Sequence, residues 1–232
     1  MGLFVLGISH QKASVEIREQ VSLVPEQIDA FLTFVRQQKI AKEAVVLSTC
    51  NRTELYFYQL KKPLESVISG WAEHTSLSSE ELSHYLYQLE GAAAAEHLFR
   101  VAAGLDSLIL GEAQIFGQLK QALAQSVRHE QVGKYLNHLF QLSFNVAKEI
   151  RTETNIGAFA VSVAFTAVQL ARQIFDGLAD YSVLLVGAGE TTELVARHLL
   201  EAGVERIDVV NRSIERAESL IETLGIEGES ST

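Results

Sequence analysis

The N-terminal part of the chain alternates hydrophobic and polar residues in short runs that predict β-strands with helices between them. The predicted strands cover residues 3–8, 44–48, 54–60 and 85–89. Pro25 opens a segment in which hydrophobic residues recur at helical spacing, and a second helix is expected from Leu64 to Glu73. The resulting order of strand, helix, two strands, helix and strand is typical of a ferredoxin-like sheet.

After Gly91 the spacing becomes helical, and the chain then changes to a second kind of domain. The predicted helices cover residues 92–103, 113–129, 134–154 and 161–175. A buried strand from Ser182, a glycine turn, a helix at 193–200, a strand at 207–210 and a last helix at 213–224 follow. This is one βαβ unit with an added helix, whereas a doubly wound dinucleotide domain has about six strands. We therefore expect a mixed α/β and α+β protein with domains at 1–156 and 157–232, the second being only the N-terminal part of a Rossmann-like domain.

Composition narrows the class of protein. Of the 232 residues, 47% are hydrophobic and 21% are charged, which is enough material for a packed core. The longest apolar stretch, 158–168, is well short of the roughly 20 residues that cross a bilayer, and no leader precedes the first strand, so we expect a cytoplasmic protein without a membrane span. A net charge of −10 argues against a general nucleic-acid binder, so that any tRNA contact should be local or lie outside this chain. The single cysteine and seven scattered histidines predict neither an internal disulfide nor a metal site.

The glycine turn after the strand at Ser182 is a candidate cofactor site. Its residues are Gly187, Ala188, Gly189, Glu190, Thr191 and Thr192. Because they lead from a strand into a helix, backbone N–H groups and the helix dipole can receive a pyrophosphate. Thr192 replaces the third glycine of the dinucleotide fingerprint, so a bare strand-to-helix turn is the alternative. Arg212 follows the next strand, where it suits the 2′-phosphate of NADP, while Asp208 within that strand is the counter-candidate for NAD.

Cys50 lies in the break between two predicted strands. Its neighbours Thr49, Asn51 and Arg52 offer hydrogen bonds and a positive charge, which favour a reactive thiolate. Inert packing is the alternative for a lone cysteine.

Further polar residues lie on the helices that follow. His97 stands beside Leu98 and Phe99 on a predicted helix, where an ordinary core histidine is the default interpretation. The segment 104–118 is more unusual, because glycines are interleaved with polar residues, namely Ser107, Glu112, Gln114 and Gln118. Gln114 and Gln118 share a helix face, whereas Glu112 could simply be a favourable charge on the first turn.

Four segments together resemble glutamyl-tRNA reductases of bacterial type. They are GISHQKASVEIRE (7–19), LSTCNRTELY (47–56), GLDSLILGEAQIFGQLK (104–120) and VGAGETTELVARHL (186–199). The resemblance covers essentially the whole chain and implies that Cys50 is the nucleophile and that His97 is critical for activity. The substrate contacts that it implies are Thr49, Cys50, Asn51, Arg52, Ser107, Glu112, Ala113, Gln114 and Gln118. Ala113 departs from the family, which often has proline there.

The resemblance also implies an activity and partners. The expected reaction is NADPH-dependent reduction of glutamyl-tRNA(Glu) to glutamate-1-semialdehyde through a thioester on Cys50, the first step of tetrapyrrole (porphyrin and haem) biosynthesis by the C5 route. The full-length family protein is a V-shaped, three-domain homodimer with a long connecting helix, and the downstream glutamate-1-semialdehyde aminomutase is a further expected partner. Since the C-terminal dimerisation domain is not in this chain, we expect the complete reaction to be impaired. Two alternatives stay open: another NADP oxidoreductase, such as a shikimate-dehydrogenase-like enzyme, and a non-enzymatic NADP-binding or tRNA-binding module.

Overall fold

The computed structural model describes residues 2–154, 156 and 163–226. The chain divides into two compact units, Met1–Ala160 and Val161–Thr232. The domain boundary that the sequence predicts after residue 156 stays a prediction, because residues 155 and 157–162 lie outside the described ones.

A four-stranded sheet forms the centre of the first unit. Its strands are β1 (Leu3–Ser9), β2 (Ala41–Ser48), β3 (Arg52–Leu60) and β4 (Tyr87–Glu90). They lie in the order β2-β3-β1-β4, with every neighbouring pair antiparallel. Because β3 lies between β1 and β2, the βαβ connection is split, as in ferredoxin-like folds. The ferredoxin-like sheet expected from the sequence is therefore confirmed.

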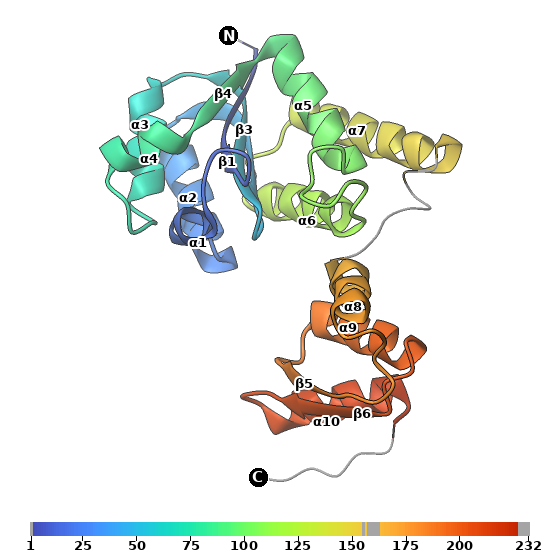
Figure 1. Cartoon of the computed structure of the whole chain (residues 1–232). Helices are drawn as coiled ribbons and strands as arrows, with labels where there is room; N and C mark the ends of the chain where they lie inside the picture. The colour runs from blue at the N-terminus through green and yellow to red at the C-terminus, as the bar shows by residue number, and fades with distance from the viewer. Residues whose placement is uncertain (1, 155, 157–162, 227–232) are drawn as a thin grey trace. The chain divides into compact units, whose positions relative to one another are not determined.

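Helices cover both faces of this sheet (Figure 1). One layer contains α1 (Val15–Val21), α2 (Pro25–Gln37), α3 (Leu64–Ala72) and α4 (Ser79–Tyr85). The other contains α5 (Gly91–Ala103), α6 (Gln114–Arg128) and α7 (Lys134–Glu153). Alternate residues of each strand enter opposite cores, so that Leu6 and Leu55 pack in the first layer and Val5 and Tyr56 in the second. All seven residues of β1 are consequently buried.

The sequence did not predict helices α1 and α4. Each has only seven residues, which is too short for a clear periodicity. A capping box begins α4, because the Ser78 hydroxyl accepts from the N–H of Glu81 and the Glu81 carboxylate accepts from the N–H of Ser78. Packing against the sheet supplies the rest of the stability of such short helices.

The second unit contains one parallel βαβ motif with flanking helices. Its elements are α8 (Val163–Ile174), β5 (Ser182–Val186), α9 (Glu190–Glu201), β6 (Arg206–Val210) and α10 (Ile214–Leu224). β5 and β6 pair in parallel, with Ser182 opposite Arg206. The expected start of a Rossmann-like domain is confirmed, although α9 begins three residues before the position 193 that the sequence predicted.

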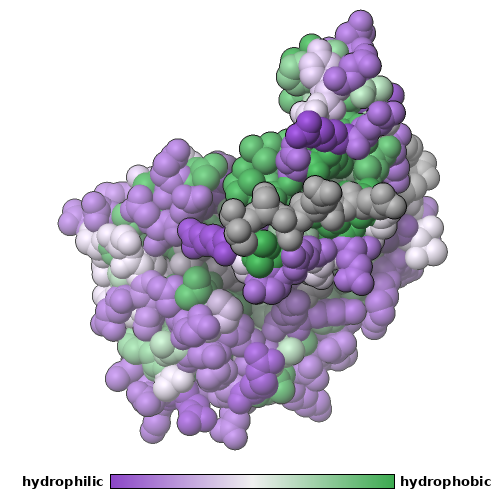
Figure 2. Space-filling view, turned by 90° about the horizontal axis from the view of Figure 1, so that it is seen from below, coloured by the Kyte–Doolittle hydropathy of each residue, from purple (hydrophilic) through white to green (hydrophobic). Residues whose placement is uncertain are grey.

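One face of this short sheet is exposed. Leu184, Val186 and Val210 are 59%, 79% and 55% accessible, and the view in Figure 2 shows a broad area where hydrophobic residues gather. Parallel sheets are normally covered on both faces, and these three apolar side chains are of the kind that such a covering layer usually buries. None of the described helices is long and apolar enough to cross a bilayer.

Candidate active site

Cys50 stands at the tip of the turn that joins β2 to β3. The Thr49 N–H donates to the carbonyl of Arg52 at 2.8 Å, and the Thr49 hydroxyl accepts from the N–H groups of Asn51 and Arg52 at 3.2 and 3.1 Å. These bonds hold a tight turn with the thiol exposed. Thr49 therefore shapes the turn, besides being a predicted substrate contact.

The segment after β1 braces this turn from outside the hairpin. The His10 N–H donates to the carbonyl of Asn51 at 2.9 Å, and Arg18 Nε donates to the carbonyl of Cys50 at 3.3 Å. Burial lowers the pKa of His10, and the positive charges of Arg52 and Arg18 lower it further. A neutral imidazole thus lies beside the turn, and its Nδ1 is buried without a hydrogen-bond partner among the described residues. His10 is not among the site residues that the sequence predicted.

A buried carboxylate, Glu54, forms the centre of the polar site. Its side chain is fully buried, and its Oε1 lies 2.8 Å from Arg52 NH1, 2.9 Å from His97 Nε2 and 2.5 Å from the Tyr87 hydroxyl. The Tyr56 hydroxyl donates to Oε2. Glu54 is not among the site residues that the sequence predicted, although a signal was present: Arg52, Glu54 and Tyr56 lie on one face of a strand that is otherwise strongly hydrophobic.

The protonation states of this centre follow from its contacts. Burial alone would raise the pKa of Glu54, but the hydrogen bond from His97 and the charges of Arg52 and His97 outweigh it and lower the pKa to about 2. Burial and the neighbouring Glu54 charge raise the pKa of Tyr87 far above its ordinary value. Glu54 is therefore an ionised acceptor, and the Tyr87 hydroxyl is a neutral donor to it.

His97 extends from α5 into the same centre. Besides its contact with Glu54, its Nδ1 lies 3.5 Å from Oδ2 of Asp106, and Arg100 NH2 lies 2.8 Å from the other oxygen of Asp106. The His97 side chain is 13% exposed. It therefore lies between two carboxylates, with a hydrogen bond to Glu54, and is not packed as an ordinary core histidine. Its part in catalysis stays a prediction.

The loop that carries Asp106 is closed by two glycines. Gly104 and Gly111 have φ angles of +77° and +80°, and the Gly111 N–H donates to the Gly104 carbonyl at 2.9 Å. A Cβ on Gly104 would lie only 3.1 Å from the Gly111 backbone. The positive φ and the close approach both require glycine. The closed loop places the Asp106 carbonyl 2.5 Å from Arg52 NH2 and leaves Ser107 half-buried.

Glu112 follows the loop, and its carboxyl group is close enough to Arg52 to interact with the charge of the guanidinium. Burial raises the pKa of Glu112, and the charge of Arg52 partly offsets this effect. The Glu112 carbonyl accepts from Arg151 NH2 at 2.7 Å. Exposed Ala113 then caps α6, which begins with exposed Gln114 and carries half-buried Gln118 one turn later. The structure thus groups Arg52, His97 and Glu112 with the Cys50 turn, whereas the described contacts do not join the two glutamines to this centre.

The glycine turn of the second unit leads into a helix whose first turn is open. It joins β5 to α9, and the Gly187 N–H donates to the carbonyl of Val210 at 2.7 Å, with φ at +105°. Gly189 caps α9 without a side-chain hydrogen bond, and a Cβ there would meet nothing within 4 Å. The space before the first turn of α9 is therefore open, so residues Gly187 to Thr192 fit a dinucleotide phosphate.

The tip of β6 carries the residues expected to distinguish NADP from NAD. Arg212 is exposed two residues beyond the strand end at Val210. Asp208 lies within the strand and pairs with Arg206 at 3.4 Å. Asn211 fixes the chain between them, because its Nδ2 donates to the Ser213 carbonyl at 2.8 Å. This placement favours Arg212 as the group that faces a ribose 2′-phosphate.

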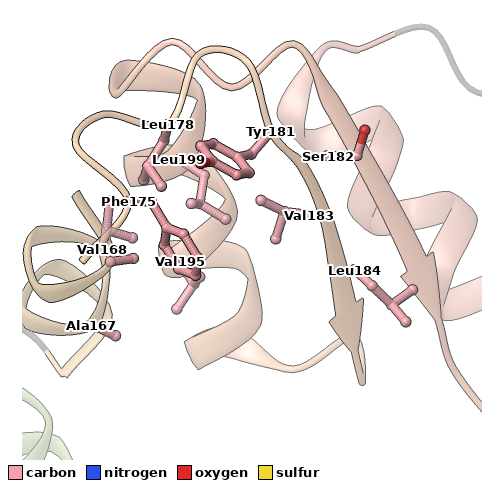
Figure 3. Close-up of a pocket in the computed structure, with 11 residues that line it drawn as sticks. Ala167, Val168, Phe175, Leu178, Tyr181, Ser182, Val183, Leu184, Val195 and Leu199 are labelled. Atoms are coloured by element: carbon pink, nitrogen blue, oxygen red, sulfur yellow. The ribbon is translucent and has the colours of Figure 1, made fainter. Parts of the chain in front are cut away.

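A separate pocket of about 370 Å³ lies among α8, β5 and α9 (Figure 3). Its lining is apolar, with Val168, Phe175 and Leu199 converging on Val183. It adjoins the start of β5, whereas the glycine turn follows the end of that strand. Since nucleotides bind at the carboxyl ends of strands in doubly wound sheets, this pocket is not the cofactor site. Among the described side chains, no group of three His, Cys, Asp or Glu residues could hold a metal ion.

Two family models match the chain. The glutamyl-tRNA(Glu) reductase N-terminal domain matches residues 6–154, and shikimate / quinate 5-dehydrogenase matches residues 169–231. The first covers the Cys50 turn, the Glu54 centre and the loop 104–112, and the second covers the glycine turn and Arg212.

Individual proteins show the same similarity. A glutamyl-tRNA reductase of Alkalilimnicola ehrlichii is 51% identical over 97% of this chain and 50% of its own length. One of Mannheimia succiniciproducens is 47% identical over 97% of this chain and 54% of its own length. The solved structure of the Methanopyrus kandleri glutamyl-tRNA reductase has a TM-score of 0.65 and 34% identity, over 97% of this chain and 53% of that one. The chain therefore spans about half the length of the relatives that it matches.

Proposed function

The chain belongs to the glutamyl-tRNA reductase family, and from this premise we propose that it takes the glutamyl group of glutamyl-tRNA(Glu) onto Cys50 for reduction by NADPH to glutamate-1-semialdehyde. The observation that carries this proposal is the exposed Cys50 thiol, at a braced turn next to a cation, Arg52, and a half-buried acid, Glu112. A nucleophile so placed can attack an ester, and the charged groups beside it can bind an amino acid.

The first half of the reaction is acyl transfer to Cys50. Its sulfur attacks the carbonyl carbon of the aminoacyl ester, the bond from that carbon to the ribose oxygen breaks, and the released tRNA hydroxyl takes the thiol proton. The Thr49 hydroxyl accepts hydrogen bonds from the N–H groups of Asn51 and Arg52, and these bonds hold the backbone of the turn that carries Cys50. A fixed turn favours an approach of about 3 to 3.5 Å between the sulfur and the ester carbon. The product is a thioester on Cys50.

The second half needs NADPH, which would be held by residues Gly187 to Thr192 and by Arg212 and would supply hydride to the thioester carbonyl. The open first turn of α9 supports this assignment, since its unsatisfied N–H groups can receive the pyrophosphate. Cys50 then leaves as a thiolate and recovers its proton, which frees the aldehyde.

The charged residues beside the turn would select the glutamyl group. Arg52 has five N–H donors and uses two of them for Glu54 and the Asp106 carbonyl, which leaves three for a substrate carboxylate. Glu112 would face the α-ammonium group. The remaining proposed contacts are Thr49, Asn51, Ser107, Ala113, Gln114 and Gln118.

We assign the whole protein to the first step of tetrapyrrole biosynthesis by the C5 route, in the cytoplasm. A homodimer and delivery of the aldehyde to glutamate-1-semialdehyde aminomutase belong to the same proposal. The support is membership of the family and, for the delivery, the reactivity of an aminoaldehyde product.

Acylation without cofactor tests the central step. The chain mixed with glutamyl-tRNA should gain the mass of one glutamyl group on the peptide that contains Cys50, and Cys50→Ser should gain none, since the exchange removes the sulfur with little change in volume. A wild-type chain that stays unmodified while folded would exclude the thioester route.

A second candidate function rests on the match of residues 169–231 to shikimate / quinate 5-dehydrogenase. Such an NADP oxidoreductase needs no cysteine. It would oxidise a hydroxy acid at an unchanged rate in Cys50→Ser, and the acylation experiment therefore separates the two candidates.

A further inference from the structure

We propose that Glu54 is a positioning residue of the acyl-transfer site, which keeps a proton on Nε2 of His97 and holds Arg52 in one orientation. His97 can then exchange a proton only at Nδ1, towards Asp106. This inference deepens the proposed function and rests on it for its catalytic meaning.

The hydrogen bonds of Glu54 determine where the His97 proton lies. Oε1 faces Arg52 NH1 at 2.8 Å, the Tyr87 hydroxyl at 2.5 Å and His97 Nε2 at 2.9 Å. An ionised carboxylate only accepts, so all three partners must donate. Tyr87 directs its single proton at Glu54 and is 3.4 Å from His97 Nε2. Nε2 therefore has to carry its own proton.

The opposite nitrogen is in a different position. Nδ1 lies 3.5 Å from Oδ2 of Asp106, which is longer than an ordinary hydrogen bond. Asp106 is 15% exposed, whereas Glu54 is not exposed at all. Gain or loss of a proton therefore costs less free energy at Nδ1 than at Nε2.

The charges around the imidazole balance before His97 is counted. Two carboxylates, Glu54 and Asp106, face two guanidinium groups, Arg52 and Arg100. The neutral Tyr87 completes the surroundings. His97 can therefore gain or lose the Nδ1 proton without leaving Glu54 unpaired, which would be the costly event in a buried site.

Arg52 depends on the same carboxylate. Its side chain is 3% exposed, and the charge of Glu54 counteracts the effect of burial and raises the pKa of the guanidinium. The two residues are neighbours on one face of β3, and Arg52 also reaches the loop at Asp106. Loss of the Glu54 charge would release both the guanidinium proposed to bind substrate and the His97 ring.

The experiment combines histidine NMR with single-turnover acylation, on this chain and on Glu54→Gln. In wild type, ring ¹⁵N signals should show a proton on Nε2 of His97 at every pH at which the chain is folded. Glu54→Gln should give a tautomer mixture. Its acylation should be about 10- to 100-fold slower, which is the size of loss seen when the carboxylate that orients a metal-binding histidine is removed. Asp29→Asn is the matched control, because it also replaces a carboxylate beside a histidine by an amide. Asp29 Oδ1 lies 2.7 Å from Nε2 of His129, on another part of the unit. This control should alter neither the His97 signals nor acylation.

The outcomes are distinct. An unprotonated Nε2 in wild type overturns the proposal even if Glu54→Gln fails to fold. A folded Glu54→Gln with unchanged His97 signals and the wild-type acylation rate also overturns it. A wild-type chain that shows the expected Nε2 proton but is never acylated supports the positioning of His97 and refutes the proposed function instead.

Discussion

Gly7 is where a single methyl group should disturb the site most directly. In the register of β1 it lies opposite Glu54 of β3 on one side and Tyr87 of β4 on the other. A Cβ at this position would be 2.7 Å from the Tyr87 ring and hydroxyl and 3.0 Å from Cγ of Glu54. The change Gly7→Ala therefore pushes Tyr87 away from the carboxylate to which it is bonded.

The size of the effect follows from these contacts. Overpacking a close-fitting core costs about 1 to 3 kcal/mol, and a buried hydrogen-bonding group that loses its partner costs about as much again. Strands β1, β3 and β4 surround the position, so the backbone cannot move far. We expect Gly7→Ala to lower the free energy of unfolding of the first unit by about 2 to 6 kcal/mol.

The assay uses the only tryptophan of the chain. Trp71 lies fully buried on α3, in the first unit, so its fluorescence during urea unfolding reports on that unit alone. Gly117→Ala is the matched control: Gly117 is an exposed position of α6 where a Cβ would meet nothing within 4 Å. There, the same exchange should stabilise by about 0.5 to 1 kcal/mol, because alanine is the better helix former. A Gly7→Ala variant that is as stable as wild type, or that unfolds at a higher urea midpoint, would show that Tyr87 and Glu54 tolerate the added methyl group.

Three further predictions concern charge, cofactor and loop. Glu54 has a pKa lowered from 4.5 to about 2, so the stability that its charge contributes is present above pH 4.5 and is lost as the pH falls towards 2. The free energy of unfolding of wild type, measured by urea titration, should therefore fall by about 3 kcal/mol over this range. Glu54→Gln should not show this fall. Arg212→Ala is to be tested in this chain joined to the C-terminal half of a relative. It should weaken NADPH binding roughly 10- to 150-fold and NADH binding much less. An equal loss for both cofactors would exclude a contact between Arg212 and the 2′-phosphate. Gly104→Ala should destabilise the first unit by about 1 to 2 kcal/mol, because the left-handed backbone disfavours a side chain; an unchanged urea midpoint would show that the loop closure at Gly111 is dispensable.

Local sequence patterns determined the order of the elements and the location of two of the candidate sites. Alternation in β1 and helical spacing in α2 are visible because each strand or long helix has a repeating hydrophobic face. The turn at Cys50 and the glycine turn at Gly187 could be found for the same reason, since both lie where such a pattern breaks. The predicted ends of the helices and strands were less accurate than their order, since α9 begins at Glu190 and not at the predicted position 193.

Only the tertiary structure showed how the polar centre is built. Glu54 is bonded to His97, 43 residues away, and to Tyr87, 33 residues away. No local periodicity encodes such contacts, and a buried acid is unfavourable unless its partners are already in place. Strand order β3-β1-β4 and the packing of α5 bring those partners together. The sequence determined where a nucleophile and a cofactor turn could lie. Pairing between distant strands decided which charged residues surround the Cys50 turn. The physical reason is that these charges interact strongly only when they are buried, and they are buried only after the sheet has formed.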